Sequence, residues 1–499
     1  MSAGVAICAE LASHGLDPEG VSARLGDAGI SAAVVPGPCR GPQPEGTLAW
    51  DRAVFAVCRD GPSGDEVMSR ARREGADAGV GAARVDAVDA SSFGPVEGRD
   101  DRVAAVLGAR LAGLAAASPS PADAFRMALP AGKVSRRSLL SSLGVRYLPV
   151  AVVGEVGCRG SVTCGLCVDA CPVSAIARGG RVPEVDREAC IGCGTCVSAC
   201  PVEGAARLPG ADLVRFESEL GRLASEAGGA GLLVRCAGSP ALPEDRLRGT
   251  WLPVDVPCLS IVTPAWALGA LAAGVRSIAL RGCGADCRAN APERARPTVA
   301  FVAESLALAG VADPGDRVRL LFPEEDGLPA GPDPAELAPP GDASTAGSLR
   351  EPAASEAALL ALGAVAGTVV GDGAPFGRIT FETHGCTVCG LCAGVCPTGA
   401  IRFDQGPVAA TLEIDRSACV GCGHCAAICP EGVLSVERGV DLERLGRGAE
   451  PLKRSAVARC RRCGEPVAPT AMLERLRPLL DPAVLATTEG LCQRCRGLG

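Results

Sequence analysis

The sequence contains few aromatic residues and almost no lysine. Its 499 residues include 9 Phe, 3 Trp and 1 Tyr, and its only lysines are Lys133 and Lys453. Acidic residues outnumber basic ones, which gives a formal net charge of −8. Proteins that bind nucleic acids need a basic surface, and many of them stack bases on aromatic rings. The composition therefore argues against a nucleic-acid partner.

Long apolar segments and an N-terminal export signal are also missing. The longest apolar run, Ala357–Val370, is shorter than the roughly 20 residues of a membrane-spanning helix, and we expect a buried helix there. Met1–Glu10 lacks the basic and apolar regions of a secretory signal. The pair Arg136–Arg137 resembles a twin-arginine signal but lies far from the N-terminus, so we interpret it as part of a linker. These features predict a cytoplasmic protein without a membrane span.

Cysteine, in contrast, is abundant, with 27 residues alongside 65 Gly and 39 Pro. An odd number of cysteines in a long chain without a secretory signal favours a reduced, metal-loaded protein over a disulfide scaffold. Their positions form an eight-cysteine block that occurs twice, two groups of four, and three separate residues. The repeated block is the strongest feature of the sequence.

The block between Cys386 and Cys429 follows the spacing of cluster ligands. Both halves, 386–397 and 419–430, read Cys-x2-Cys-x2-Cys-x3-Cys-Pro, as in bacterial two-cluster ferredoxins. Three thiolates on one tight loop can bind one cubane, and the fourth cysteine begins a segment that reaches the other cluster; this doubled pattern argues against zinc. Between the halves, alternating residues at 401–404 and 411–415 predict a β-hairpin. The predicted 4Fe–4S ligands are set C (Cys386, Cys389, Cys392 and Cys429) and set D (Cys396, Cys419, Cys422 and Cys425).

The earlier block, between Cys158 and Cys200, has the same pattern with one longer gap. Five residues separate Cys158 from Cys164, and Ser161 stands at the regular ligand position. Either Cys158 reaches the iron through a longer loop, or a three-iron cluster forms; we favour Cys158 as the ligand. The predicted 4Fe–4S ligands are set A (Cys158, Cys164, Cys167 and Cys200) and set B (Cys171, Cys190, Cys193 and Cys196).

Two histidines stand next to cluster cysteines. His384 precedes Cys386 and His424 precedes Cys425. We interpret both as ordinary surface or packing residues, with a hydrogen bond from the ring to a cluster sulfur as the alternative.

The region between the blocks has the pattern of an α/β domain. Apolar segments at 232–235, 277–280 and 317–322 predict strands, which alternate with helices predicted at 264–273 and 299–309. Four cysteines stand at expected strand ends and form the middle set (Cys236, Cys258, Cys283 and Cys287).

The run PCLSIVTPAWALGALAAGVRSIALRGCGADC resembles the delta iron–sulfur subunit of methyl-viologen-reducing hydrogenase. The resemblance implies a 2Fe–2S cluster on the middle set and electron relay toward heterodisulfide reductase. The chain departs from that family at Cys236-Ala-Gly-Ser, which keeps one thiol of a pair, and at Arg288, where the family has histidine. Four cysteines still suffice for a 2Fe–2S cluster; the alternative is a structural domain with reduced buried thiols.

The first 118 residues resemble the N-terminal segment of the heterodisulfide reductase A family. Cys8, Cys39 and the segment DRAVFAVCRDGPSGDEVMSRARREGADAG, which contains Cys58, parallel that family's cysteines and its strand–loop–helix. The family continues into a flavin domain, but this chain has no Gly-x-Gly-x-x-Gly fingerprint after a strand, so we expect no flavin. We interpret the three cysteines as buried thiols, with remnants of a cluster site as the alternative.

Two Cys-x-x-Cys pairs near the end of the chain form the C-terminal set (Cys460, Cys463, Cys492 and Cys495). The pairs are separated by 28 residues. Paired knuckles of this kind predict a tetrahedral four-thiolate zinc site. A rubredoxin-type iron or a further iron–sulfur cluster is the alternative.

The predicted fold is multidomain, with two α+β ferredoxin domains of the bacterial two-cluster type, α/β domains at the N-terminus and in the middle, and a zinc-ribbon-like C-terminus. The predicted segments are an α/β domain (1–118), a linker (119–150), the first ferredoxin domain (151–210), the middle α/β domain (211–322), a linker with one apolar helix (323–375), the second ferredoxin domain (376–440) and the zinc-ribbon-like domain (441–499).

The predicted function is electron transfer through four 4Fe–4S clusters and one 2Fe–2S cluster, with one zinc ion. The sequence contains no motif that identifies a catalytic residue, so we expect a non-catalytic subunit of an oxidoreductase complex. The expected partner is a hydrogenase, a dehydrogenase or a flavin-containing subunit like heterodisulfide reductase. Two alternatives are a Cys236–Cys287 domain that itself reduces a disulfide, and a redox sensor or scaffold.

Overall fold

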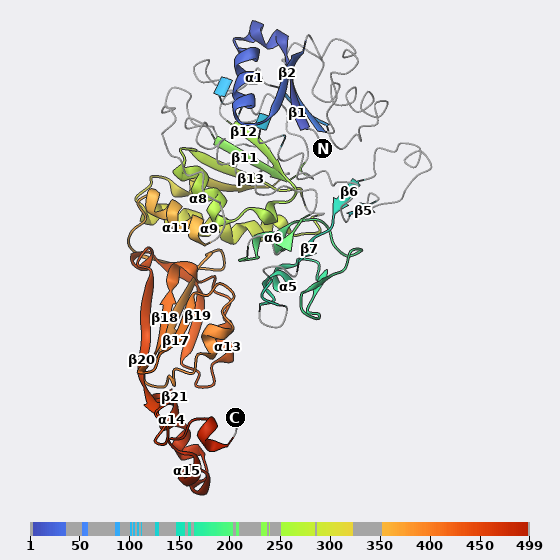
Figure 1. Cartoon of the computed structure of the whole chain (residues 1–499). Coiled ribbons are helices and arrows are strands. Elements are labelled where there is room, and N and C mark those ends of the chain that lie inside the picture. Colours follow the sequence, from blue (N-terminus) through green and yellow to red (C-terminus); the bar gives the residue numbers. More distant parts are fainter. Residues whose placement is uncertain are drawn as a thin grey trace.

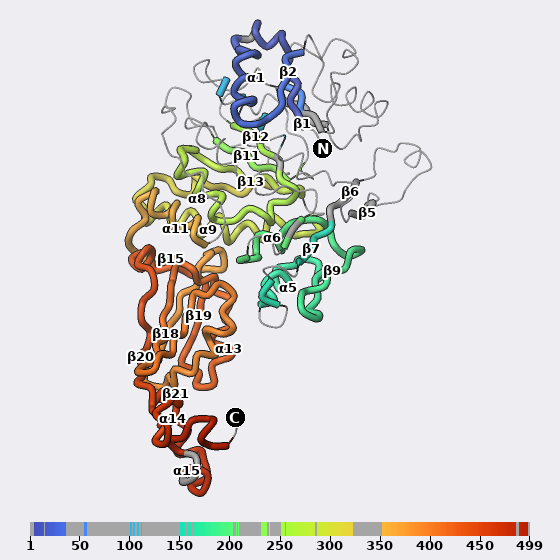
Figure 2. The backbone as a smooth tube through the Cα atoms, in the orientation of Figure 1, coloured from blue at the N-terminus to red at the C-terminus, as the bar shows by residue number. Residues whose placement is uncertain are grey.

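The computed structural model describes most of the chain from residue 146 onward and parts of the region before it. The described residues are 3–35, 52–57, 85–89, parts of 100–111, 125–128, 146–154, 158–160, 164–202, 206–208, 231–236, 239, 251–284, 287–322 and 352–497. The N-terminal sheet lies at one end of the molecule and the C-terminal helices lie at the other (Figure 1). The backbone trace shows the same arrangement, with the first eight-cysteine block beside the middle domain (Figure 2).

The N-terminal domain is built on a parallel sheet with the strand order β2-β1-β3-β4. Its elements are β1 (Ala3–Cys8), the 3-10 helix η1 (Ala9–His14), α1 (Pro18–Asp27), β2 (Ser31–Val35), β3 (Arg52–Val57) and β4 (Val85–Asp89). Val5 and Ile7 of β1 and Leu25 of α1 are fully buried in its core. The α/β character expected for this domain is confirmed.

The first eight-cysteine block forms two short helices and short antiparallel ladders. Strand β7 (Val152–Val153) pairs with β10 (Ala206–Arg207), and β8 (Ile176–Ala177) pairs with β9 (Glu184–Val185). Before the block, within the segment 119–150 that the sequence analysis assigns to a linker, β5 (Phe125–Ala128) pairs with β6 (Arg146–Pro149). Helices α5 (Leu166–Ala170) and α6 (Thr195–Ser198) pack against each other. Each helix contains the third cysteine of its motif, so both halves of the repeat have the same local fold.

The middle domain is built on a second parallel sheet, with the order β12-β11-β13-β14. Its elements are β11 (Gly231–Cys236), β12 (Trp251–Val256), the 3-10 helix η6 (Leu259–Ile261), α8 (Pro264–Ala272), β13 (Ser277–Arg281), α9 (Ala291–Leu308), α10 (Pro314–Arg317) and β14 (Val318–Leu321). Leu232 and Leu233 point to opposite faces of the sheet and are both buried, as expected for a parallel sheet covered on both sides. The predicted alternation of strands and helices is confirmed.

The apolar run 357–370 does not form the single buried helix expected from the sequence. Helix α11 (Ala353–Ala361) packs against α8 but ends before Gly363, and β15 (Thr368–Val370) follows. Gly363 and Gly367 have φ angles of 82° and 103°, which a right-handed helix cannot contain. Among the described residues, no helix has both the length and the apolar character needed to cross a membrane.

The second eight-cysteine block forms two antiparallel sheets, ordered β15-β19-β16 and β17-β18-β20-β21. Its elements are β16 (Gly377–Phe381), α12 (Leu391–Gly394), β17 (Ile401–Gln405), β18 (Ala409–Asp415), η8 (Arg416–Ala418), α13 (His424–Ile428), β19 (Leu434–Asp441) and η9 (Leu442–Arg444). Strands β17 and β18 are the hairpin that the sequence predicts. Helices α12 and α13 again contain the third cysteine of each motif.

Strand β20 (Ala449–Arg459) connects this block to the C-terminal segment. It pairs with β18 and then with β21 (Pro466–Pro469), and Cys460 follows it directly. The remaining elements are α14 (Thr470–Leu476), η10 (Arg477–Leu479), α15 (Pro482–Thr488) and η11 (Arg494–Arg496). Residues 449–459 therefore extend a sheet that begins in the second ferredoxin-like block.

Candidate metal centres

Each of the four predicted cubane sets lines a cavity of its own. Sets A, B, C and D lie around four separate cavities, and each cavity is lined by the four cysteines of one set. The cavities have similar sizes, from about 300 Å³ for set D to about 370 Å³ for set A. In each case three cysteines come from one half of the repeat and the fourth comes from the other half.

The turns between the first two cysteines of the regular motifs contain a left-handed residue. Gly192 and Gly421 both have φ angles of 67°, and Val388, at the same motif position, has a φ angle of 54°. This turn directs a backbone N–H toward the preceding sulfur, and the Val388 N–H lies 3.4 Å from Cys386 Sγ. Glycine adopts such a conformation without penalty, whereas a β-branched valine is strained in it.

Cys158 lies on the cavity of set A despite its longer spacing. Two hydrogen bonds join the described residues around it: the Gly160 N–H donates to Cys158 Sγ at 3.4 Å, and the Cys164 N–H donates to the Gly160 carbonyl oxygen at 3.1 Å. Gly160 has a φ angle of 92°, which favours glycine at this position. The five-residue gap is therefore compatible with four thiols around one cavity.

Burial is the main influence on the ionisation of these thiols. It raises the pKa of Cys167, Cys392 and Cys419 to about 11 and that of Cys425 to about 12. Negative charge on other cysteines of the same set raises these pKa values further, while backbone N–H groups such as that of Gly421 oppose the shift. Thiols of this kind bind a metal centre with release of protons, because the metal replaces the proton as the positive partner.

The imidazole of His424 gives an independent indication of a bound group. Its Nδ1 atom is buried and has no hydrogen-bond partner in the described part of the chain. Buried polar atoms without a partner are rare in native structures, and a cluster sulfur beside Cys422 and Cys425 would supply the missing partner. The four-thiol linings of the cavities and this unpartnered nitrogen fit 4Fe–4S clusters. The nitrogen also favours the alternative stated for His424, a hydrogen bond from its ring to a cluster sulfur. His384 is exposed.

The middle set lies at the carboxyl ends of parallel strands, where α/β folds commonly build their sites. Cys236 ends β11, Cys258 follows β12, Cys283 follows β13, and Cys287 precedes α9. The thiols lie beside one another in series, Cys236 next to Cys258 and Cys283, and Cys283 next to Cys287. These contacts, followed by burial, raise the pKa of Cys258 and Cys283. The donor set fits a thiolate-bound cluster.

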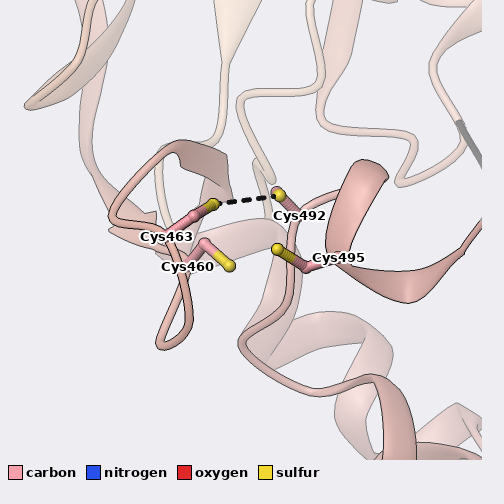
Figure 3. A group of neighbouring side chains, drawn as sticks. All are labelled: Cys460, Cys463, Cys492 and Cys495. Carbon is pink, nitrogen blue, oxygen red and sulfur yellow. Dashed lines mark hydrogen bonds between the residues drawn. The ribbon is translucent and has the colours of Figure 1, made fainter.

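The C-terminal set brings its four cysteines together from both knuckles (Figure 3). The four Sγ atoms all lie within 4.8 Å of one another, and Cys463 Sγ lies 3.5 Å from Cys492 Sγ. Sulfurs about 2.3 Å from a tetrahedral zinc ion would lie about 3.8 Å apart, so the spacing fits such an ion. The N–H groups of Cys492, Arg462 and Cys463 lower the pKa of Cys460 to about 6, whereas neighbouring thiols raise that of Cys495 to about 12.

Of the three separate cysteines of the N-terminal domain, the structure describes only Cys8. Cys8 is buried at the end of β1. Cys39 and Cys58 lie outside the described residues.

Hydroxyl groups beside the sulfurs are functional candidates that the sequence reasoning missed. Thr195 Oγ1 lies 3.3 Å from Cys193 Sγ, and Ser260 Oγ lies 3.4 Å from Cys258 Sγ. Both hydroxyl residues stand two positions after a cysteine, so the pattern Cys-x-Ser/Thr is the signal that could have found them. Hydrogen bonds to the sulfurs are one of the means by which proteins set cluster potentials.

Three segments of the chain match known protein families. Residues 385–433 match the 4Fe–4S dicluster domain, and residues 182–206 match a 4Fe–4S binding domain. Residues 246–326 match the delta subunit of methyl-viologen-reducing hydrogenase. A comparison with curated proteins found no significant match. The chain therefore contains 4Fe–4S cluster-binding domains and a segment similar to that delta subunit, which supports an electron-transfer role.

Proposed function

We propose that the chain is an electron-relay subunit of a hydrogenase-like or heterodisulfide-reductase-like complex. It would hold 4Fe–4S clusters on sets A to D, a 2Fe–2S cluster on the middle set and zinc on the C-terminal set. When bound, an iron–sulfur cluster supplies one-electron transfer at a potential that its surroundings determine. The observation that carries the proposal is the placement of each predicted set around one cavity of its own.

Contacts between the middle domain and the first ferredoxin-like domain support a route between them. Ser198 Oγ donates to the Ile261 carbonyl oxygen at 3.1 Å, and Ile261 lies three residues after Cys258. Ile191 and Cys193, from the loop of set B, pack against the buried core cluster that includes the middle domain. Set B is therefore the neighbour of the middle set.

The remaining sets follow one another in a continuous order. Negative charge on Cys167 of set A raises the pKa of Cys196 of set B, and negative charge on Cys422 of set D raises the pKa of Cys164 of set A, which places the thiols of each pair near each other. Within the second block, Cys425 of set D interacts with Cys392 of set C. Electron tunnelling weakens steeply with distance, so these neighbours favour the order middle set, B, A, D, C.

The similarity of residues 246–326 to a hydrogenase delta subunit supports the middle domain as the entry or exit point. The N-terminal resemblance to the heterodisulfide reductase A family stays a prediction. It would give the complex a second redox partner at the N-terminal domain, next to the middle domain in the molecule (Figure 1).

Metal analysis of the anaerobically purified protein, together with electron paramagnetic resonance, tests the proposal. We expect about 16 iron atoms from the four cubane sets, about two more from the middle set, and one zinc. Reduction should produce both 4Fe–4S and 2Fe–2S signals. Far fewer irons without cubane signals would refute the relay.

About 16 irons without a 2Fe–2S signal would refute only the cluster on the middle set. The alternative in which the Cys236–Cys287 domain reduces a disulfide would then be tested directly. Disulfide reductase activity that is lost on Cys283→Ser would support that alternative.

A further inference from the structure

The side chain of Lys453 forms hydrogen bonds that connect strand β20 to the loop leading into set C. Its Nζ donates to the carbonyl oxygen of Thr383 and to that of Cys386, each at 2.7 Å. The contact joins positions 67 residues apart to the first ligand of the set. Lys453 is one of only two lysines in the sequence.

The sheet fixes the position from which Lys453 reaches the loop. Lys453 pairs with Leu412 of β18, whose side chain is buried. Two residues further along β20, the hydroxyl of Ser455 is buried and accepts a hydrogen bond from the Ala471 N–H at 3.2 Å. Lys453 itself is half-buried. The ammonium group is therefore held in place by a central strand.

The two hydrogen bonds that the Lys453 ammonium group donates restrict the conformation of the loop before Cys386. The carbonyl oxygens of Thr383 and Cys386 must both face Nζ, and this orients the backbone that carries the first sulfur. Hydrogen bonds that involve a charged group contribute more to stability than hydrogen bonds between neutral groups.

The charge of Lys453 also reaches the sulfur. Its Nζ atom lies 2.7 Å from the carbonyl oxygen of Cys386, so the positive charge lies close to the residue that supplies the first sulfur of the set. The same interaction must favour any further negative charge placed on the set.

We propose that Lys453 is a positioning residue that orients the Cys386 loop and raises the reduction potential of the cluster on set C. This inference rests on the proposed function, because it requires a 4Fe–4S cluster at that set. Reduction adds one electron, so a four-thiolate cubane becomes one charge more negative, and a fixed cation nearby stabilises the reduced form. The cation would favour the arrival of an electron at set C, the last set in the proposed order.

A redox titration of the full chain, with dithionite as the reductant and electron paramagnetic resonance as the detector, tests the inference. In Lys453→Gln one 4Fe–4S component should titrate at a more negative potential than in the wild type. Lys453→Arg keeps the charge, so its components should titrate close to their wild-type potentials. Arg454→Gln removes one charge from the next, exposed residue of β20 and should leave all components in place.

A second experiment shows whether the component that shifts in Lys453→Gln belongs to set C. In a Cys389→Ser/Cys392→Ser background, which removes two ligands of the set, Lys453→Gln should cause no further shift. An unchanged titration in Lys453→Gln, or a shift that persists in this background, would overturn the inference.

Iron and sulfide content separates this test from that of the proposed function. A wild-type protein without a cluster on set C would refute the proposed function itself. If the cluster on set C is present but its potential is the same in the wild type and in Lys453→Gln, the inference is refuted and the proposed function is not. If Lys453→Gln lowers the iron content, loss of iron to a chelator in Lys453→Arg provides the second measurement. If Lys453→Arg loses iron as slowly as the wild type, the positive charge at this position holds the loop. If Lys453→Arg loses iron as fast as Lys453→Gln, the positive charge has no such role and the inference is overturned.

Discussion

At the scale of the residue, the cysteine spacing constrains the backbone more tightly than the side chains between the cysteines suggest. Three regular turns contain a left-handed residue, and two of these are glycines. The third is Val388, which is fully buried and strained by about 1–3 kcal/mol in this conformation. Nothing in the sequence identifies Val388 as unusual, since valine is an ordinary core residue. The strain becomes visible only when the turn is compared with those at Gly192 and Gly421.

Cys158 is the ligand that the motif specifies least well, and its substitution tests the longer loop. We expect Cys158→Ser to remove one thiolate from set A and to convert that cluster to a three-iron form, with loss of about one iron per chain. The oxidised protein should then show a three-iron signal in electron paramagnetic resonance. Adding Ser161→Cys restores the regular spacing and should abolish the signal. Unchanged iron content and spectra in Cys158→Ser would show that Cys158 is not a ligand.

At the scale of the element, the start of strand β16 packs directly against the turn of set D. A Cβ atom on Gly377 would lie 2.5 Å from the Gly421 Cα and 2.8 Å from Cys419 Sγ. Real Cβ atoms do not approach backbone this closely, so strand and turn would have to separate. The ligand loop is therefore positioned by a glycine in a strand 42 residues before Cys419 in the sequence.

Replacement of Gly377 by alanine tests this packing. We expect Gly377→Ala to displace Cys419, to lower the iron content by up to one cluster and to reduce the free energy of unfolding by about 1–3 kcal/mol. Gly394→Ala is the matched control, because a Cβ atom on Gly394 meets nothing within 4 Å. Iron analysis and denaturant unfolding of both variants give the comparison. Equal iron content and stability would contradict the proposed role of the β16 contact.

The sequence predicts what local spacing determines and misses what the tertiary fold adds. The cysteine sets could be proposed because each motif fixes its ligands within a few residues, and the strands around the middle set because apolar runs alternate with helices. The contacts of Lys453 and Gly377 could not be predicted from the sequence, because each contact joins segments that only the fold brings together. The helix expected at 357–370 failed for a related reason: hydrophobicity was uniform along the run, but Gly363 and Gly367 require a left-handed backbone.

At the scale of the whole molecule, helix α9 of the middle domain joins the two ferredoxin-like blocks. Arg294 Nη1 donates to the Ala170 carbonyl oxygen of α5 at 3.3 Å. One turn further along α9, Pro297 lies against Gly373, in the turn before β16. The two blocks therefore meet the same part of α9, and this arrangement brings Cys164 and Cys422 within electrostatic range. The step from set A to set D in the proposed order depends on this proximity.

A side chain at Gly373 should separate the blocks without touching a cysteine. Its Cβ atom would lie 1.9 Å from the Pro297 carbonyl oxygen and 2.8 Å from the Thr298 nitrogen, both backbone atoms that can move only with the helix. We expect Gly373→Val to weaken the magnetic coupling between the reduced clusters of sets A and D while the iron content stays at the wild-type level. Pulsed electron paramagnetic resonance of the dithionite-reduced protein measures the coupling.

The control for this separation is Gly371→Ala, because a Cβ atom on Gly371 meets nothing within 4 Å. It should leave the coupling unchanged. Coupling as strong in Gly373→Val as in the wild type would mean that the contact between α9 and the Gly373 turn does not determine the distance between sets A and D. The step from A to D would then have to be removed from the proposed order, and the two blocks would act as separate relays on either side of the middle domain.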